Sequence, residues 1–440
     1  MSTIIALATA TGRAGIQVVR CSGPKSLELL FGHTGLRDPK PGRMYYRAVK
    51  DNVSRETLDR GLVVYFQGPS SFTGEDVVEF HLHGAPVIAR ALLDMMAKQH
   101  GVRHAQAGEF TRRALENGRM SLSEVEALGQ LLMADTRSQL RVLEPIFDGR
   151  LQQHVEGLRR LLIQVASRIE ASIDFDDEGD VPKDVANDLA NDLGLIDHRL
   201  AQLMDVGARN QHIFEGVKIA IIGAPNTGKS SLINYLAGHD LALVSDIPGT
   251  TRDVLRAEMD ITGVKVTFFD TAGLRDTDDQ VEQLGIARSH DVMRQADMHI
   301  IMTEGYLSED DVRLLADYPQ AIHVASKLDL GGVSPENALH VSTKTGAHMD
   351  VLLGVIGERL QELLPDMDGE AGLINQRQLA ACGQAMFHVK HCLELSKTPE
   401  HVDLLGEELR ASIHALDELI GKVSSEDVLG EIFAHFCIGK

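Results

Sequence analysis

The chain reads Val217-Lys218-Ile219-Ala220-Ile221-Ile222-Gly223-Ala224-Pro225-Asn226-Thr227-Gly228-Lys229-Ser230 over residues 217–230. The first six residues form an apolar run that is typical of a buried parallel strand. The last eight match the phosphate-binding pattern G-x-x-x-x-G-K-[ST], and residues 231–236 continue in a helical pattern. Backbone N–H groups of such a loop and of the helix N-terminus bind phosphate oxygens. The sequence therefore predicts a P-loop nucleotide-binding domain.

Two later motifs provide the partners that a P-loop needs to hold a metal-bound triphosphate. Gly249-Thr250-Thr251-Arg252 lies in a polar segment, and Phe268-Phe269-Asp270-Thr271-Ala272-Gly273 ends an apolar strand. Lys229 is expected to reach the β- and γ-phosphates, and Ser230 and Thr251 are expected to bind Mg²⁺. The motifs follow the P-loop in the order that GTPases of the translation-factor class use.

The second of these motifs also bears on hydrolysis. Asp270 is expected to hold the water shell of Mg²⁺, and the N–H of Gly273 is expected to sense the γ-phosphate. Many small GTPases place a glutamine directly after this glycine to orient the attacking water, but Leu274 stands here. Leucine cannot position water, so another group must do so. Within the polar segment 275–288, which suits a mobile switch, Glu282 is the candidate catalytic residue.

A third motif is expected to recognise the base. Ser326-Lys327-Leu328-Asp329 follows an apolar strand, and Asp329 can accept two hydrogen bonds from a guanine edge, which adenine cannot supply. Ser342-Thr343-Lys344 is expected to complete the pocket. GTPases of this class usually begin the base-reading motif with asparagine, so Ser326 predicts weaker nucleotide affinity with unchanged specificity.

The positive charge needed at the phosphates has more than one candidate source. Arg252 and Arg275 are possible arginine fingers that the sequence cannot assign. Asn226 within the P-loop offers a side-chain oxygen that, together with carbonyls of residues 245–250, can hold a monovalent cation. K⁺ at that place would stand in for the missing finger.

Length, charge and cysteine usage exclude several classes of protein. A chain of 440 residues suggests two or three domains. No run reaches the ~18 apolar residues of a membrane span, and the first seven residues lack the basic region of a secretory signal. Four scattered cysteines are typical of reduced thiols, so a cytoplasmic protein is expected. The formal net charge of −21 argues against a protein-wide basic face for nucleic acid.

The charge is distributed unevenly along the chain. Residues 1–120 hold 16 Lys and Arg against 11 Asp and Glu, so the acidic excess lies in the remainder. This asymmetry leaves two interpretations open. The N-terminal surface is either merely solvated differently, or it belongs to a mildly basic domain that binds an anionic ligand.

Hydrophobic periodicity predicts a multidomain α/β protein. Residues 1–118 mix strand-like runs with a helix that begins at Pro86, which predicts an α+β domain. Apolar residues recur at steps of three and four in residues 119–212 and 365–440, which predicts long amphipathic helices. Neither segment can bury its apolar stripe alone. We therefore expect one helical bundle domain built from both segments, with a Ras-like P-loop GTPase domain, residues 213–364, inserted between them.

Several segments outside the GTPase motifs indicate a family. They are Gly12-Arg13-Ala14-Gly15-Ile16, Phe72-Thr73-Gly74-Glu75-Asp76, His83-Gly84-Ala85-Pro86, Ala107-Gly108-Glu109-Phe110-Thr111-Arg112-Arg113-Ala114, Ile173-Asp174-Phe175 and the terminal Ile432-Phe433-Ala434-His435-Phe436-Cys437-Ile438-Gly439-Lys440. With them, the chain resembles the bacterial tRNA-modification GTPase family MnmE, also called TrmE, along nearly its whole length. The N-terminal segments and the Phe-Cys-Ile-Gly-Lys ending are more diagnostic than the P-loop, which many GTPases share.

The resemblance implies a K⁺-stimulated GTPase that acts with an FAD-dependent partner, MnmG (GidA), in a heterotetrameric or larger complex. Together they would add a carboxymethylaminomethyl or aminomethyl group to C5 of the wobble uridine of tRNA. The one-carbon donor would be 5-formyl-tetrahydrofolate or 5,10-methylene-tetrahydrofolate, bound by the N-terminal domain, which also forms the homodimer. The folate contacts of the family fall on Arg20, Glu79, Arg119 and Lys440; lysine is also found at the position of Arg119.

The resemblance also implies the residues around GTP. The K⁺ ligands of the family fall on Asn226, Ser245, Ile247 and Thr250, and Glu282 matches its catalytic carboxylate. Cys437 matches a family cysteine whose chemistry stays open. The residues expected to contact GTP belong to the P-loop, the two switch-like segments and the base pocket: Asn226, Thr227, Gly228, Lys229, Ser230, Ser231, Ser245, Asp246, Ile247, Pro248, Gly249, Thr250, Thr251, Asp270, Thr271, Ala272, Gly273, Lys327, Asp329, Ser342, Thr343 and Lys344.

Other interpretations stay open at the level of sequence. One is a GTPase switch that assists the assembly of ribosomes or other RNA particles, although such factors usually add a basic RNA-binding domain. Another is a folate-dependent methyl-transfer protein with a regulatory GTPase. His81 and His83 suggest a metal pair, but no third ligand is evident, so histidines with satisfied hydrogen bonds at a strand end are expected. The sequence does not reveal which tRNAs are modified, the amine source, or how hydrolysis is coupled to modification.

Overall fold

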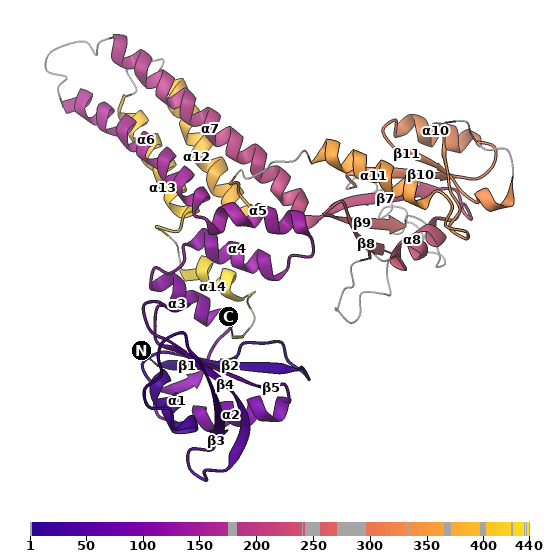
Figure 1. The fold of residues 1–440 in the computed structure, drawn as a ribbon. Helices are drawn as coiled ribbons and strands as arrows, with labels where there is room; N and C mark the ends of the chain where they lie inside the picture. Colours follow the sequence, from indigo (N-terminus) through magenta and orange to yellow (C-terminus); the bar gives the residue numbers. More distant parts are fainter. Residues whose placement is uncertain are drawn as a thin grey trace, which may run out of the picture. The chain divides into compact units, whose positions relative to one another are not determined.

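The computed structural model describes residues 2–174, 183–239, 241–242, 256–270, 296–331, 335, 337–364, 371–396, 402–423, 426–434, 436 and 438–439 (Figure 1). The chain divides into two compact units. The first consists of Met1–Gly129 with Ile413–Lys440, and the second is Gln130–Ser412. Among the described residues, no helix is both long and apolar enough to cross a membrane.

The first unit is built on a six-stranded sheet. The strands are β1 (Thr3–Leu7), β2 (Ile16–Ser22), β3 (Met44–Lys50), β4 (Thr57–Phe66), β5 (Val77–His83) and β6 (Val102–His104), in the order β3-β4-β5-β2-β1-β6. All neighbours are antiparallel except β1 and β6, which are parallel. Runs of β-branched and aromatic residues with turn signals between them produce these short strands.

The two faces of this sheet differ. Tyr45, Val63, Phe80 and Val19 are neighbours across four strands and belong to one hydrophobic core. Helices α1 (Ser26–Thr34) and α2 (Pro86–Ala97) bury that face through residues such as Leu29 and Leu92. Because successive side chains of a strand alternate between faces, the neighbouring residues of each strand point to the opposite side.

The opposite face carries Arg20 and Glu79. Met44, Val64, Glu79, Arg20 and Ala6 are cross-strand neighbours in one row. Helix α3 (Glu109–Glu116) covers part of this face, where its Phe110 packs with Ile4, Ala6 and Ala105. Arg20 and Glu79 therefore lie on the side of the sheet away from α1 and α2.

The end of the chain returns to this unit. Helix α14 (Glu426–Ala434) packs against α4 (Leu122–Leu132), where Phe433 and Phe436 contact Val125. Ile438 forms an antiparallel bridge with Ala107. Gly439 has a φ of 106°, and a Cβ at this position would lie 2.2 Å from the carbonyl oxygen of Leu7. Only glycine fits so close to the end of β1 in this backbone conformation.

The second unit contains a Ras-like nucleotide-binding sheet. Its strands are β7 (Val217–Gly223), β8 (Arg256–Ile261), β9 (Val264–Asp270), β10 (Met298–Thr303), β11 (Ile322–Ala325) and β12 (Leu339–His340), in the order β12-β11-β10-β7-β9-β8. Only β8 is antiparallel to its neighbour. Within the described residues, the helices of this domain are α8 (Lys229–Ala237), α10 (Glu309–Asp317) and α11 (Met349–Leu363), with a short 3₁₀ turn, η2, at Leu328–Leu330.

Long helices make up the rest of the second unit. They are α5 (Arg137–Phe147), α6 (Arg150–Asp174), α7 (Lys183–Glu215), α12 (Gln376–Leu395) and α13 (Val402–Leu419), the last of which runs on into the first unit. Although far apart in sequence, α7 and α12 pack along each other; Asn210 Nδ2 donates to the carbonyl of Leu373, and Cys382 Sγ to that of Leu200.

The predicted fold class, with an α+β domain, a helical domain and an inserted P-loop domain, is confirmed. Helices α7 and α12 come from the two segments that flank the P-loop domain, as the unpaired apolar stripes require. The exact domain boundaries stay a prediction.

Candidate functional site

The P-loop lies between β7 and α8, as the motif requires. Gly228 adopts a left-handed conformation immediately before the helix, with a φ of 95°. The Lys229 side chain is 4% exposed, and its Nζ donates to the carbonyls of Gly223 at 2.9 Å and Ala224 at 2.7 Å. The loop thus curls around the ammonium group, which keeps this charge where phosphate oxygens would bind.

Two oxygen-bearing side chains meet beside the loop. Ser230 lies in the first turn of α8, and Asp270 ends β9, which is the parallel neighbour of β7. Ser230 Oγ donates to Asp270 Oδ2 at 2.6 Å, and Asp270 is 1% exposed. A hydroxyl and a carboxylate next to a phosphate-binding loop are the donors that Mg²⁺ prefers. These residues fit the ion that the motif implies.

The predicted base pocket lies at the ends of β11 and β12. Asp329 Oδ1 accepts a 2.7 Å hydrogen bond from Ser342 Oγ. This bond, helped by the charge of Lys344, holds the pKa of Asp329 below its ordinary value. The carboxylate therefore stays ionised at neutral pH, as acceptance of two guanine hydrogen bonds requires.

The neighbouring residues of the base-reading motif have other roles. Ser326 is nearly buried, and its Oγ donates to the carbonyl of Thr303 at 3.3 Å. Its hydroxyl lies 4.0 Å from where a Cβ on Gly228 would be, so the motif borders the P-loop. Lys327 takes a left-handed conformation and forms an ion pair with Glu304.

A second polar site occupies the open face of the first sheet. Arg20 and Glu79 are cross-strand partners, and Arg20 Nε donates to Glu79 Oε1 at 2.9 Å. The other oxygen of Glu79 lies 3.0 Å from His81 Nε2. The side chains of Arg20 and Glu79 are 21% and 15% exposed, respectively, so the pair is accessible to a ligand but largely shielded from water. We call this arrangement, with Arg119, the sheet-face site.

Aromatic rings and the chain end complete the sheet-face site. The guanidinium carbon of Arg20 lies 5.5 Å from the Phe72 ring centre and 5.8 Å from that of Phe110. Its Nη1 approaches the carbonyl of Gly439 at 3.5 Å. Arg119 Nε donates to the carbonyl of Ser71, the residue before Phe72. Both arginines thus contact one short loop.

The family models match almost the whole chain. The model described as the GTP-binding protein TrmE N-terminus matches residues 3–119, and the MnmE helical domain model matches residues 122–437. The tRNA modification GTPase MnmE of Azorhizobium caulinodans is 40% identical over 440 residues, covering 100% of this chain and 99% of its own. That of Cereibacter sphaeroides is 41% identical over 444 residues, covering 100% of both.

The chain belongs to the MnmE family.

Several solved structures are similar to part of this MnmE-family chain. The G domain of the FeoB iron transporter of T. maritima is 25% identical over 33% of this chain and 99% of its own, with a TM-score of 0.25. The assignment of the nucleotide-binding fold rests instead on the strand order and the P-loop described above.

Part of the predicted site lies outside the described residues. This part comprises the segments after the P-loop and after β9, the catalytic candidate, and the chain end: Ser245, Asp246, Ile247, Pro248, Gly249, Thr250, Thr251, Arg252, Thr271, Ala272, Gly273, Leu274, Arg275, Glu282, Cys437 and Lys440. The predicted roles of these residues stay predictions. Asn226, the one predicted K⁺ ligand within the described residues, is exposed at the turn of the P-loop with a φ of 66°.

Some residues of the sheet-face site carried no predicted role. Phe72 and Phe110 lie in two of the segments that indicated the MnmE family, and that membership was their only signal. His81 was expected to be a satisfied histidine, and the bond to Glu79 confirms this; His83 likewise pairs with Asp59 at 2.8 Å. Within the described ranges, no group of three or more His, Cys, Asp or Glu residues can hold a metal ion.

Proposed function

We propose that this chain hydrolyses GTP in the modification of tRNA. With an FAD-dependent partner of the MnmG (GidA) type, it adds a carboxymethylaminomethyl or aminomethyl group to C5 of the wobble uridine. The observation that carries this proposal is the end-to-end match to tRNA modification GTPases in a chain that joins a P-loop domain to the sheet-face site. The names of the relatives supply the substrate class.

The described residues support clear roles in nucleotide binding. Lys229 neutralises phosphate charge, and Asp329 accepts hydrogen bonds from guanine. Ser230 would coordinate Mg²⁺, with Asp270 orienting its water ligands, and the ion would polarise the phosphoryl oxygens. Since Asp270 is buried, its charge acts in an environment where electrostatic interactions are stronger than in water.

We propose separately that a bound K⁺ ion supplies the remaining positive charge at the phosphates. Asn226, with Ser245, Ile247 and Thr250, would bind K⁺, and Glu282 would orient the attacking water in place of Leu274. GTP hydrolysis should therefore rise with K⁺ and not with Na⁺, and Asn226→Ala should abolish the difference. Equal rates of phosphate release in the two salts would refute the K⁺ site.

The sheet-face site fits a tetrahydrofolate one-carbon donor, as its 5-formyl or 5,10-methylene form. Arg20 and Arg119 supply cations for glutamyl carboxylates or pterin oxygens, Glu79 accepts from the pterin N–H edge, and Phe72 offers an aromatic surface. Lys440 would add a further cation. Calorimetry should detect binding of 5-formyl-tetrahydrofolate, and the double variant Arg20→Ala, Arg119→Ala should lose it. Unchanged affinity would remove this site from the proposal.

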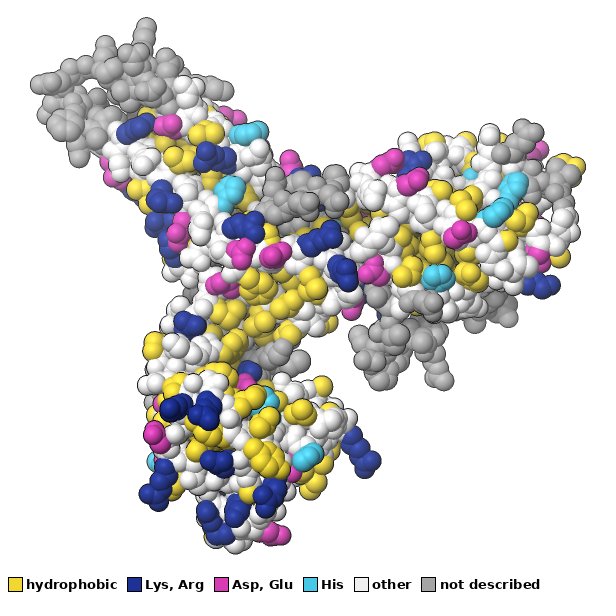
Figure 2. Space-filling model, in the orientation of Figure 1, with side chains coloured by type: hydrophobic (Ala, Val, Ile, Leu, Met, Phe, Trp, Pro, Cys, Tyr) yellow, Lys and Arg dark blue, Asp and Glu magenta, His cyan; other side chains and the backbone are white. Residues whose placement is uncertain are grey.

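The exposed surface of the first unit supports a homodimer. Met44, Tyr46 and Leu62 lie on the open face of the sheet and are 52%, 62% and 39% exposed, beside the sheet-face site. Figure 2 also shows Lys and Arg side chains gathered over the visible face of this unit, in keeping with an anionic ligand or tRNA. We also propose that the protein forms a homodimer, that it forms a complex with the FAD-dependent partner, and that it acts in the cytoplasm.

Analysis of cellular tRNA provides the decisive experiment. Cells that lack the protein should lose a modified wobble nucleoside, measured by mass spectrometry of digested tRNA. The wild-type gene should restore the nucleoside, and a Lys229→Ala variant should not. A normal nucleoside profile in the deletion strain would refute the proposed function.

A further inference from the structure

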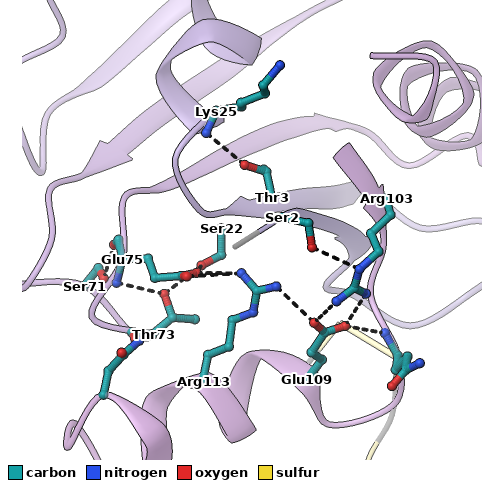
Figure 3. Close-up of polar contacts among 12 residues, drawn as sticks. Ser2, Thr3, Ser22, Lys25, Ser71, Thr73, Glu75, Arg103, Glu109 and Arg113 are labelled. Carbon is teal, nitrogen blue, oxygen red and sulfur yellow. Dashed lines mark hydrogen bonds and ion pairs between the residues drawn. The ribbon is translucent and has the colours of Figure 1, made fainter. Parts of the chain in front are cut away.

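The loop between β4 and β5 is held by a chain of ion pairs (Figure 3). Arg113 Nη1 lies 2.9 Å and 3.2 Å from the two carboxylate oxygens of Glu75. Its Nη2 donates to Glu109 Oε1 at 3.0 Å, and Glu109 also binds Arg103 through both oxygens. One guanidinium group of α3 therefore joins the loop to the rest of the network.

This network is poorly explained by stability alone. The side chains of Arg113, Glu109 and Glu75 are only 11%, 11% and 13% exposed. Burial acts to raise the pKa of Glu109, but hydrogen bonds from Arg103, the N–H of Gln106 and Arg113 outweigh it and hold the pKa below its ordinary value. Shielding such charges from water costs free energy, and apolar replacements of buried ion pairs are often neutral or stabilising. A positional role accounts better for the charges.

The network and its neighbours fix the shape of the loop. Glu75 Oε2 accepts from Ser22 Oγ at 2.6 Å, and Ser22 Oγ lies 2.7 Å from Thr73 Oγ1. Asn117 Nδ2, just beyond α3, donates to the carbonyl of Thr73 at 2.7 Å. Ser22 is two residues after Arg20 on β2, so both lie on the same face of the sheet. The loop is thus tied to the sheet beside Arg20.

The constrained loop presents two groups to the predicted ligand-binding arginines. The carbonyl of Ser71 accepts from Arg119 Nε at 3.2 Å, and the ring of Phe72 lies under the guanidinium of Arg20. The side chain of Arg119 also packs on Gly74, where a Cβ would lie 3.2 Å from its Cγ. A shift of the loop therefore moves partners of both arginines at once.

We propose that Glu75 and Arg113 are positioning residues for the anionic ligand of the sheet-face site. Their ion pair fixes the loop that orients Arg20 and Arg119. This inference rests on the proposed folate site, and neither residue needs to touch the ligand. Arginine suits the role because its planar fork bonds both oxygens of Glu75 and one oxygen of Glu109. The ammonium of lysine carries its three donors on one atom and does not reproduce this geometry.

The test compares two neighbouring arginines in the full-length protein. Arg113→Lys should weaken binding of 5-formyl-tetrahydrofolate on the order of tenfold or more, because the loop that orients Arg20 and Arg119 is then no longer fixed before the ligand binds. Arg112→Lys is the matched control, since Arg112 lies on the same helix and pairs with Glu116 at the surface. Its affinity should equal that of the wild type. Glu75→Gln, which keeps the size and removes the charge, is the second variant if Arg113→Lys does not fold.

A double variant separates positioning from general destabilisation. If the ion pair acts through the loop, Arg113→Lys combined with Phe72→Ala should lose less binding free energy than the sum of the two single losses, because both changes disturb the contact of Phe72 with Arg20. Additive losses in the double variant would overturn the inference. It would also be overturned if the wild type binds the folate and both Arg113→Lys and Glu75→Gln bind it with unchanged affinity. If the wild-type protein binds no folate, the folate proposal fails and this inference fails with it. That result differs from the one above, in which the wild type binds folate but the variants do not behave as expected.

Discussion

Ser230 and Asp270 are joined by a 2.6 Å hydrogen bond from the hydroxyl of α8 to the carboxylate at the end of β9. The two strands of the P-loop domain that position these residues are parallel neighbours, and Asp270 pairs in register with Ile221. The fold therefore brings together Ser230, an expected Mg²⁺ ligand, and Asp270, which is expected to hold the water shell of the ion.

Replacement of Asp270 by asparagine should reduce Mg²⁺-dependent GTP hydrolysis. The amide keeps the shape of the side chain but loses the charge, and bonds to charged groups contribute about 1.5–3 kcal/mol. We expect kcat/KM to fall roughly 10- to 100-fold and the Mg²⁺ concentration for half-maximal rate to rise. Asp317→Asn, at the exposed end of α10, is the control. A variant as active as the control would contradict this role of Asp270.

Replacement of Asp329 by asparagine should change the preferred base. A carboxylate accepts from the N1–H and 2-amino groups of guanine, whereas an amide can donate to the 2-oxo group of xanthine. The variant should lose affinity for GTP and gain affinity for xanthosine triphosphate, as measured by competition with a fluorescent guanine nucleotide. Retained preference for GTP would show that another residue reads the base.

The Ser342 hydroxyl should set the acid limit of GTP binding. It lowers the pKa of Asp329. The ionised form that binds guanine therefore persists as the pH falls through the ordinary pKa of an aspartate, about 4. Binding is present above the folded pKa and lost below it. In Ser342→Ala the loss should move to higher pH. Thr345→Ala, which leaves the Ser342–Asp329 bond in place, should follow the wild-type titration; coincidence of all three curves would argue against this coupling.

Substitution of Gly439 by alanine should impair the proposed folate site and leave the GTP site intact. The added Cβ would meet the carbonyl of Leu7 at 2.2 Å, in a backbone conformation that alanine disfavours. The chain end should leave the sheet, and folate affinity should fall at least severalfold while basal GTP hydrolysis stays unchanged. Gly430→Ala is the control, because space around this helical glycine is open. Equal folate affinity in the two variants would show that the chain end does not support the site.

The described part of the nucleotide site was predictable because its signals are local. Strand, loop and helix follow each other within residues 217–236, so their spacing alone places Lys229 and Ser230. The order of the motifs predicted that Ser230 and Asp270 both lie near Mg²⁺, but not the hydrogen bond between them. The hydrogen bond from Ser342 to Asp329 was not predicted either, because it depends on how η2 meets the end of β12.

The sheet-face site was less predictable because its contacts join distant residues. Arg20 and Glu79 are 59 positions apart, and only family resemblance selected them from many charged residues. No sequence pattern pairs Glu75 with Arg113, although both lie in segments that indicated the family. Their partnership depends on the way α3 crosses the sheet, which periodicity does not specify.

The approach of Gly439 to Arg20 has a consequence for biosynthesis. These residues lie 419 positions apart, so the N-terminal sheet acquires this contact only after residue 439 has left the ribosome. Chains fold from the N-terminus as they are made, and the nucleotide-binding domain is complete earlier. A growing chain would thus be able to bind GTP before the proposed folate site is complete, and a prematurely terminated product would bind nucleotide but lack that proposed site.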